Sequence, residues 1–266
     1  MIAPILMLGA GRMGGAMLEG WRAARAFQPS DLMIRDPSPG PAALAAAEAG
    51  AMLNPPDAEL ARARTVVLAV KPQLWREAAA ETASWLAEDA VIVSIAAGVK
   101  AAEISREFGG RPVARIMPTT AAAIGRGTAS VYADDPAALS RAHALFEPLG
   151  TVVDLADEAH MHAATAVSGS APAYLYAFIE ALEGAGAAAG LSPEDARALA
   201  RSTIIGAAAL LAATDEDPAE LRRQVTSPGG TTEAALNVLF QGKGGLPDLL
   251  REAVTAAVRR SKELGA

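Results

Sequence analysis

Short apolar runs separated by helical segments fill the first half of the chain. Most runs contain no charged residue and are closed by Gly, Pro or polar residues, which is typical of strands buried on both faces of a parallel sheet. They lie at residues 5–8, 32–34, 65–70, 91–95 and, more weakly, 113–117. Segments with helical spacing, such as 13–24 and 42–49, lie between them. This alternation predicts an α/β domain of the Rossmann type with a doubly wound parallel sheet.

The pattern changes near residue 155. Strands at 129–132 and 151–154, on either side of a helix over 136–148, are the last ones predicted. Beyond them only helices are expected, over 172–189, 193–214, 234–240 and 247–264. Ser192-Pro193 and Asp217-Pro218 are strong helix starts, because each joins a capping side chain to a proline at the first helical position. We predict two domains, residues 1–155 and an all-helical domain over 156–266.

Composition excludes several classes of protein. The 266 residues carry a net charge of −7 without a cluster of Lys and Arg, so we expect no nucleic-acid partner. The chain has no cysteine and only three scattered histidines, so no metal site is predicted. The N-terminus lacks the pattern of a signal peptide, and the longest apolar stretch, residues 204–214, is too short to span a bilayer. We therefore expect a cytoplasmic protein without a membrane partner.

A glycine motif opens the first predicted helix. Gly9-Ala10-Gly11-Arg12-Met13-Gly14 is a G-x-G-x-x-G sequence directly after the first strand. The first glycine allows the tight turn, the second admits a pyrophosphate, and the third lets the helix pack on the strand. In this context the motif predicts binding of a nicotinamide dinucleotide by residues 1–155.

The nature of that dinucleotide is expected to depend on the end of the second strand. Asp36 is suited to the ribose hydroxyls of NADH, and Arg35 to the 2′-phosphate of NADPH. The two signals conflict, so the cofactor is NADPH or NADH. The turns after the next two strands, Ala69-Val70-Lys71-Pro72 and Ala96-Ala97-Gly98, are expected on the same side of the sheet, since ligands bind beyond the carboxyl ends of parallel strands.

Two polar segments stand out in the Ala-rich second half. Residues 168–174 and 226–233 combine hydroxyls with Gly and Pro, and each leads into a helix. Backbone N–H groups and hydroxyls at a helix start can hold a carboxylate. Each segment alone is explained by a helix cap, but together they favour a substrate site.

These residues resemble those of the pyrroline-5-carboxylate reductases. The most specific match is Val225-Thr226-Ser227-Pro228-Gly229-Gly230-Thr231-Thr232, which is similar to the family signature. The glycine motif, the turns at 69–72 and 96–99, and the segment 168–174 follow in the family's order. The resemblance therefore covers nearly the whole chain.

The resemblance implies an enzyme that reduces 1-pyrroline-5-carboxylate to L-proline with NADPH or NADH, in the last step of proline biosynthesis. It implies a homodimer formed through the helical domain, often within a ring of dimers. The reaction needs a hydride, a bound carboxylate that orients the ring and a proton on nitrogen. No metal, Cys or catalytic His is required.

The resemblance also implies the residues of the site. Phosphate contacts are expected from Gly9, Gly11, Arg12, Met13 and Gly14, with further cofactor contacts from Ala69, Val70, Lys71, Pro72, Ala96 and Ala97. The substrate carboxylate is expected on Ser227, Gly229, Gly230 and Thr231. Thr232 is expected at the ring nitrogen, as the catalytic residue. Glu158 and Thr165 match positions near the substrate pocket.

The chain departs from the family pattern at four positions. Asn is usual at Arg12 and Thr119, Pro at Ala121, and Gly at Ala171. Arg12 adds a positive charge beside the phosphates. Thr119 puts any role of an Asn side chain in doubt.

Two other functions are compatible with a Rossmann domain followed by helices. A β-hydroxyacid dehydrogenase needs a catalytic Lys in its second half, but residues 155–240 contain none. A non-catalytic NAD(P)H sensor needs no carboxylate site, which the two polar segments argue against. The three histidines are expected to have no chemical role, with His162 the least certain because it lies close to the substrate segment.

Overall fold

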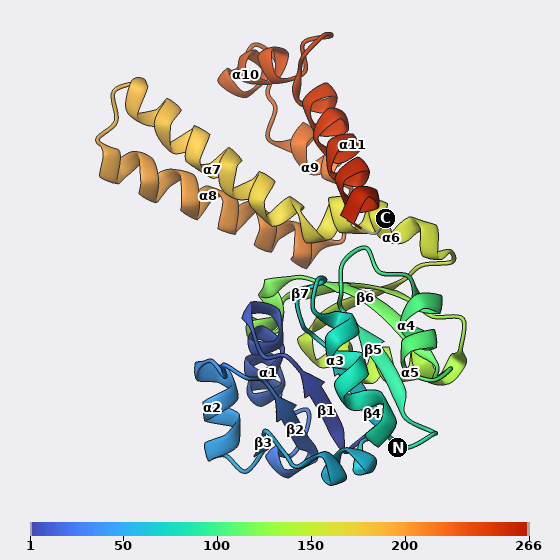
Figure 1. Cartoon of the computed structure of the whole chain (residues 1–266). Coiled ribbons are helices and arrows are strands. Elements are labelled where there is room, and N and C mark those ends of the chain that lie inside the picture. The colour runs from blue at the N-terminus through green and yellow to red at the C-terminus, as the bar shows by residue number, and fades with distance from the viewer. Residues whose placement is uncertain (1, 265–266) are drawn as a thin grey trace. The chain divides into compact units, whose positions relative to one another are not determined.

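The computed structural model describes residues 2–264 (Figure 1). Contacts divide the chain into two compact units: residues 1–169 with 257–266, and residues 170–256. We call them the sheet unit and the helical unit. Met1, Gly265 and Ala266, which the predicted domains include, lie outside the described residues.

The sheet unit contains one eight-stranded sheet in the order β3-β2-β1-β4-β5-β6-β7-β8. The strands are β1 Ile5–Leu8, β2 Leu32–Arg35, β3 Met52–Leu53, β4 Thr65–Leu68, β5 Val91–Ser94, β6 Val113–Pro118, β7 Gly127–Tyr132 and β8 Gly150–Asp154. Strands β1 to β6 pair in parallel, as predicted. Strand β7 runs antiparallel to β6, and β8 is parallel to β7. The short 3-10 segment between β6 and β7 explains this reversal, because a parallel partner would need a long crossover.

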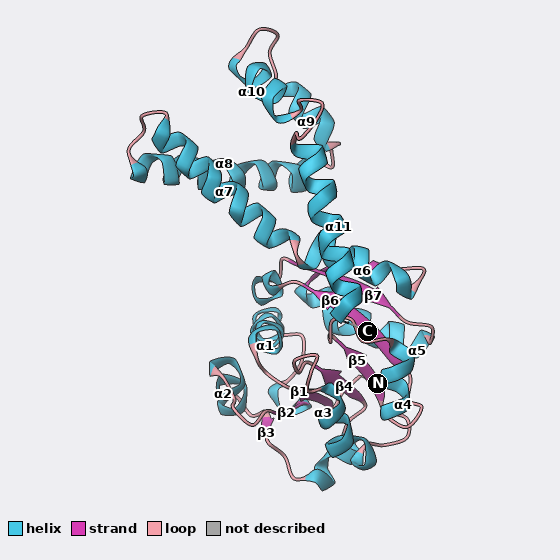
Figure 2. Cartoon of the chain, turned by 45° about the horizontal axis from the view of Figure 1, so that its top comes forward, coloured by secondary structure: helices cyan, strands magenta, loops and turns pink. Residues whose placement is uncertain are grey.

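Helices cover both faces of this sheet, as a doubly wound fold requires (Figure 2). One face packs against α1 (Arg12–Ala24), α2 (Pro41–Glu48) and α5 (Pro136–Phe146). The other packs against α3 (Trp75–Thr82) and α4 (Ala101–Glu107). Successive residues of β1 alternate between the two cores, with Met7 in the first and Leu8 in the second. Both faces are buried, which is why the strands are almost continuously apolar.

The sheet unit extends beyond the predicted boundary at residue 155. After β8 the chain forms a 3-10 turn (Glu158–His160), the short helix α6 (Met161–Ala164) and a π-helical segment (Thr165–Gly169). This segment packs against β6 and β7. The imidazole Nδ1 of His162 also lies 3.0 Å from the Ser261 hydroxyl in the last turns of α11. The change in sequence pattern therefore marks the last strand, whereas the compact unit ends at Gly169.

The helical unit is formed by five helices. They are α7 (Ala171–Ala188), α8 (Pro193–Thr214), α9 (Pro218–Gln224), α10 (Thr231–Leu239) and α11 (Leu246–Leu264), whose last turns belong to the sheet unit. Both predicted caps are confirmed. The Ser192 hydroxyl accepts the N–H of Asp195 at 3.0 Å, and the Asp217 carboxylate accepts the N–H of Ala219 at 2.8 Å.

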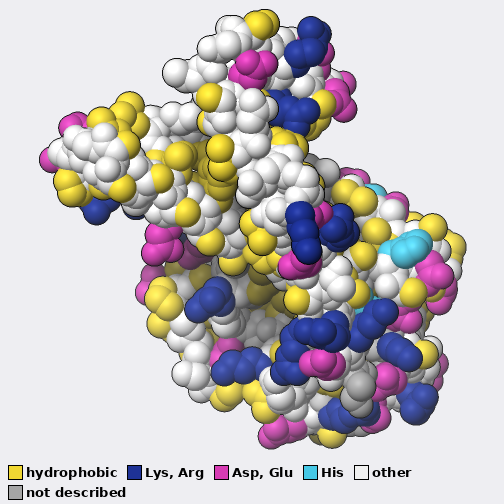
Figure 3. All heavy atoms as spheres, turned by 90° about the horizontal axis from the view of Figure 1, so that it is seen from above, with side chains coloured by type: hydrophobic (Ala, Val, Ile, Leu, Met, Phe, Trp, Pro, Cys, Tyr) yellow, Lys and Arg dark blue, Asp and Glu magenta, His cyan; other side chains and the backbone are white. Residues whose placement is uncertain are grey.

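Large apolar side chains of the helical unit lie on its surface (Figure 3). Tyr176 in α7 and Ile205 in α8 are 67% and 69% exposed. By length and composition α8 could also cross a membrane, although the sequence analysis found no apolar stretch long enough. The difference arises because α8 is long and mostly apolar as a whole, whereas charged residues such as Arg197 and Arg201 interrupt its apolar sequence. An apolar surface of this extent is typical of a protein interface.

Candidate active site

The glycine turn after β1 has the geometry that its sequence predicts. Gly9 has a φ of +88°, and a Cβ there would lie 2.9 Å from the Ala69 carbonyl oxygen. A Cβ on Gly14 would lie 2.5 Å from the Gly9 carbonyl oxygen. Neither position tolerates a side chain, since the obstacle in both cases is backbone. The turn thus holds β1, β4 and the start of α1 close together.

Gly11 has a different environment, because a Cβ there would meet no protein atom within 4 Å. It is the N-cap residue of α1, and it makes no side-chain capping bond. The first turn of α1 also contains no acidic residue. Free N–H groups at the positive end of a helix, beside space that only a glycine leaves open, form a phosphate site. We call the glycine turn and the first turn of α1, residues 9–14, the cradle. It fits the pyrophosphate of a dinucleotide.

Asp36 supports this turn from the end of β2. Its carboxylate accepts the N–H of Ala10 at 2.6 Å and that of Ser38 at 2.8 Å, and the residue is only 8% exposed. The Asn54 side chain further fixes it by exchanging two hydrogen bonds with its backbone, at 2.9 and 3.0 Å. Asp36, which was predicted to bind the ribose hydroxyls, thus accepts hydrogen bonds from the protein's own backbone.

Arg35, the competing signal for a 2′-phosphate, is paired with Asp57. Its Nη1 atom is buried and has no hydrogen-bond partner among residues 2–264. Beside this strand end, a cavity of about 570 Å³ is lined by Gly11, Arg12, Ser38 and Gly40, among others. Arg12 is exposed and is in no ion pair within the described chain. The cationic group among the residues that line this cavity is therefore Arg12.

The other predicted cofactor residues follow neighbouring strands. Ala69, Val70, Lys71 and Pro72 come after β4, which lies beside β1, and Ala96 and Ala97 come after β5, which lies beside β4. Parallel strands place these turns at the same edge of the sheet as the glycine motif. Lys71 is exposed there. The structure thus brings the cofactor residues to one edge, and their individual contacts stay predictions.

Glu158 forms an ion pair inside the sheet unit. Its Oε1 atom accepts from Nη1 of Arg115 at 2.8 Å and from the N–H of Ala101, at the start of α4, at 2.7 Å. The Arg115 side chain is 5% exposed and that of Glu158 25%. Sequence reasoning did not identify Arg115. Its position inside an otherwise apolar strand was the available signal, because a buried charge needs a partner.

Thr165 and Ser168 lie in the π-helical segment. Their hydroxyls donate to carbonyl oxygens one turn earlier, Thr165 to Met161 at 2.7 Å and Ser168 to Ala164 at 2.9 Å. Segments of π-helix are frequent at functional sites.

Among the positions that depart from the family pattern, the buried Thr119 accepts the N–H of Thr128 at 3.0 Å, so this hydroxyl has a structural role.

In the helical unit, residues 226–230 form a tight loop before α10. Gly229 has a φ of +68° and donates its N–H to the Glu233 carboxylate at 2.7 Å, while Gly230 donates to the Ser227 carbonyl at 2.9 Å. Gly230 is the N-cap residue of α10 and provides no side-chain cap. The first turn of α10 therefore presents N–H groups beside the hydroxyl-bearing Thr231 and Thr232. This arrangement can bind a carboxylate without a cationic side chain.

His143 and His162 have ordinary structural partners. His143 lies between Glu147 and Asp154, and its hydrogen bond with Glu147 raises its pKa above 6.5. Burial lowers the pKa of His162, and the charge of Arg115 adds to this effect. Among residues 2–264, no group of three or more His, Asp and Glu side chains is arranged to hold a metal ion.

The cradle at the carboxyl edge of a doubly wound sheet defines a dinucleotide-binding protein of the Rossmann class. Two family descriptions match the chain: "NADP oxidoreductase coenzyme F420-dependent" over residues 4–98, and "Pyrroline-5-carboxylate reductase dimerisation" over residues 158–264. A pyrroline-5-carboxylate reductase of Pseudomonas aeruginosa is 39% identical over 98% of this chain and 96% of that protein. The chain belongs to the pyrroline-5-carboxylate reductase family.

Two solved structures of this family resemble the whole chain. The pyrroline-5-carboxylate reductase of Coxiella burnetii is 31% identical, with a TM-score of 0.91 and full coverage of both chains. The Plasmodium falciparum enzyme, solved with NADP bound, is 26% identical, with a TM-score of 0.84 over 99% of this chain and 98% of that one. The match to a dimerisation domain accounts for the exposed apolar side chains of the helical unit, and the chain is a homo-oligomer.

Proposed function

We propose that the chain reduces 1-pyrroline-5-carboxylate to L-proline with NADPH or NADH. The observation that carries this proposal is the glycine- and hydroxyl-rich loop at the N-terminus of α10, which has no Arg or Lys and in which the Gly229 N–H already binds a carboxylate, that of Glu233. The substrate carries one carboxylate, which suits such a site. The sheet unit supplies the cradle for the second reactant. The relative of Pseudomonas aeruginosa, named for this reaction, supports the assignment.

We assign the following roles to the chain's own residues. Ser227, Gly229, Gly230 and Thr231 hold the substrate carboxylate, which takes the place of the Glu233 carboxylate at the Gly229 N–H, and the Thr232 hydroxyl binds the ring nitrogen. When bound, the dihydronicotinamide supplies a hydride to the imine carbon. The nitrogen gains a proton, and the C=N bond becomes a single bond. Fixing two reactants in one geometry is the main catalytic task and can supply about 7–11 kcal/mol of barrier reduction.

Glu158 and Thr165 act in our proposal as positioning residues. Glu158 ties the segment after β8 to β6 and α4, and Thr165 starts the π-helical segment. We further propose that residues 1–155 bind the cofactor, and that 156–266 bind the substrate and form the homodimer. We expect the dimers to form a ring and the enzyme to be cytoplasmic.

Replacing Thr232 by Ala should lower kcat about tenfold, because one hydrogen bond to the nitrogen, of about 1.4 kcal/mol, is lost in the transition state. The KM for pyrroline-5-carboxylate should change less, since the carboxylate contacts remain. Thr226→Ala is a suitable control, because the Thr226 hydroxyl bonds only to the Arg222 carbonyl among residues 2–264. An unchanged kcat in Thr232→Ala would remove this residue from the reaction.

Arg12→Ala should raise the KM for NADPH about tenfold and leave the KM for NADH nearly unchanged, because a charged contact to a phosphate is worth about 1.5–3 kcal/mol. The reason for assigning selectivity to Arg12 is structural: Arg35 is paired with Asp57, whereas Arg12 and Ser38 line one cavity. Steady-state kinetics with both cofactors tests this. Equal increases for the two cofactors would place Arg12 at the shared pyrophosphate instead.

The proposed function is tested by following cofactor oxidation with two imines. Pyrroline-5-carboxylate should be reduced, and 1-pyrroline, which lacks the carboxylate, should react with a kcat/KM at least about a hundredfold lower, because a charged anchor is missing. A protein that binds NADPH but oxidises it with neither imine would be a sensor. Comparable rates with both imines would show that the loop before α10 does not bind the carboxylate.

A further inference from the structure

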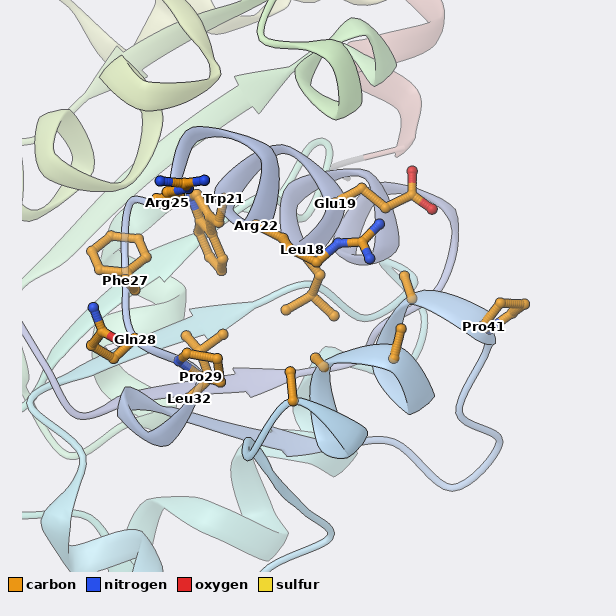
Figure 4. Close-up of a pocket in the computed structure, with 14 residues that line it drawn as sticks. Leu18, Glu19, Trp21, Arg22, Arg25, Phe27, Gln28, Pro29, Leu32 and Pro41 are labelled. Carbon is orange, nitrogen blue, oxygen red and sulfur yellow. The ribbon is translucent and has the colours of Figure 1, made fainter.

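A second cavity, of about 440 Å³, lies between α1 and α2 of the sheet unit (Figure 4). Its walls include the second half of α1, from Leu18, and the start of β2, at Leu32, and at Glu19, Pro41 and Ala42 it adjoins the cavity beside the glycine motif. The glycine motif lies at the start of α1, and Gly11 is about 10 Å from Leu18 along the helix. Its volume is in the range of small-molecule sites.

The walls of this cavity are largely apolar and of two kinds. On one side, Leu18, Phe27, Pro29 and Leu32 point towards the space between the helices (Figure 4). On the other side, α2 presents only small side chains. These are Ala42, Ala45, Ala46 and Ala49. A gap between a flat alanine surface and larger apolar groups suits a planar ring.

The aromatic wall is fixed before any ligand binds. The indole Nε1 of Trp21 donates to the Leu145 carbonyl at 2.7 Å, and the Trp21 side chain is almost fully buried. Phe27 packs edge-on against this indole, with ring centroids 5.3 Å apart and an interplanar angle of 86°. Because Trp21 is 1% exposed, a ligand would meet the Phe27 ring, which the indole holds in place, and a fixed surface reduces the ordering that binding requires.

The border of the cavity is positively charged. Arg22 and Arg25 line it from α1, and neither is in an ion pair within residues 2–264. Glu19 is the one carboxylate among the lining residues, and it lies towards the cofactor end, where it also lines the other cavity. Positive charge at this border contrasts with the chain's net charge of −7.

Arg25 adds an independent observation, because it is held in a left-handed conformation. Its φ of 52° is unusual for a residue other than glycine, although it closes α1 at the position where glycine is preferred. Strained residues of this kind cluster at ligand sites. Here the conformation places a guanidinium beside Trp21 and Phe27 (Figure 4).

We propose that this cavity binds a small aromatic carboxylate, with the ring between α2 and the aromatic wall and the carboxylate at Arg25, whereas the Arg22 guanidinium lies towards Glu19 (Figure 4). A planar guanidinium matches a carboxylate in geometry and charge. The ring would contact surfaces that are already apolar and ordered. The lining residues of this cavity belong to the sheet unit and differ from those assigned to the substrate and the cofactor.

The test is calorimetric titration of the full homo-oligomer with 3-phenylpropionate at low ionic strength, with excess L-proline present throughout. L-Proline is included to occupy the carboxylate site that the proposed function places at residues 227–231. The neutral amide, 3-phenylpropanamide, is the control ligand, because it has the same ring and chain but no carboxylate charge. Three variants are compared: Ala45→Leu, which fills the cavity; Ala47→Leu, on the same helix but outside the lining; and Arg25→Gly, which removes the guanidinium at a position that favours glycine.

We expect saturable binding of 3-phenylpropionate and binding of the amide about tenfold weaker. Ala45→Leu should abolish the binding and Ala47→Leu should leave it unchanged. Arg25→Gly should weaken it about tenfold without lowering the melting temperature. No saturable heat up to about 10 mM ligand, which corresponds to negligible affinity, would overturn the proposal. So would equal affinity for the amide, or equal effects of the two leucine variants.

Discussion

Replacing Glu158 by Ala is expected to lower the free energy of unfolding by about 2–3 kcal/mol. The substitution leaves the 5%-exposed Arg115 side chain without its partner and removes an acceptor from the start of α4. Loss of one member of a buried pair costs about 3–5 kcal/mol. The partial exposure of Glu158 justifies the lower figure. Urea unfolding at one fixed protein concentration measures this, since assembly contributes to stability.

Two further variants distinguish loss of the Arg115–Glu158 ion pair from a general loss of stability. Glu158→Gln retains an acceptor for Ala101 and should lose less stability than Glu158→Ala. The double variant Arg115→Met with Glu158→Leu should also lose less, because no buried charge remains. A change of less than about 0.5 kcal/mol in Glu158→Ala, the size of a typical surface substitution, would contradict the structural role. Glu158 would then be free to contact the substrate, as the family resemblance implied.

Gly11→Ala is expected to weaken NADPH binding at least about a hundredfold, or by about 2.7 kcal/mol, while the fold is unchanged. A methyl group there meets no protein atom within 4 Å, and the φ of −66° suits alanine. The methyl would occupy space that the pyrophosphate needs. Binding is measured by the fluorescence of NADPH, and folding by the melting temperature.

Gly242→Ala is the control for this substitution, because that exposed glycine also has no neighbour within 4 Å of a Cβ. It should bind NADPH as the parent chain does. Gly9→Ala and Gly14→Ala are poor probes, since both would clash with backbone and disturb the fold. NADPH binding by Gly11→Ala with unchanged affinity would show that the cofactor does not approach the cradle as proposed.

The sequence predicted the central strands β1, β2, β4 and β5 well, because burial on both faces makes them almost continuously apolar. It did not predict β3, which has only two residues. It did not predict the direction of β7, since hydrophobicity contains no information on strand orientation. The connection between β6 and β7 was the physical signal: it holds only a 3-10 turn, which is too short for a parallel crossover.

The sequence was less informative about polar partners. At the end of β2, Arg35 and Asp36 suggested opposite cofactors, but each has a partner that only the tertiary structure supplies. Asp36 accepts the Ala10 N–H, and Arg35 is paired with Asp57. The loop before α10 was easier to identify, because its glycines, proline and hydroxyls are consecutive. Local chemistry of this kind is visible in sequence, whereas contacts between distant residues are not.

The most direct test of the proposed reaction is transfer of deuterium. The chain is incubated with pyrroline-5-carboxylate and NADPH deuterated at carbon 4 of the dihydronicotinamide, with each stereoisomer in a separate reaction. We predict that one stereoisomer yields proline with a single deuterium at carbon 5, the former imine carbon, and that the other yields unlabelled proline. Absence of proline, or absence of label with both stereoisomers, would contradict direct hydride transfer by this protein.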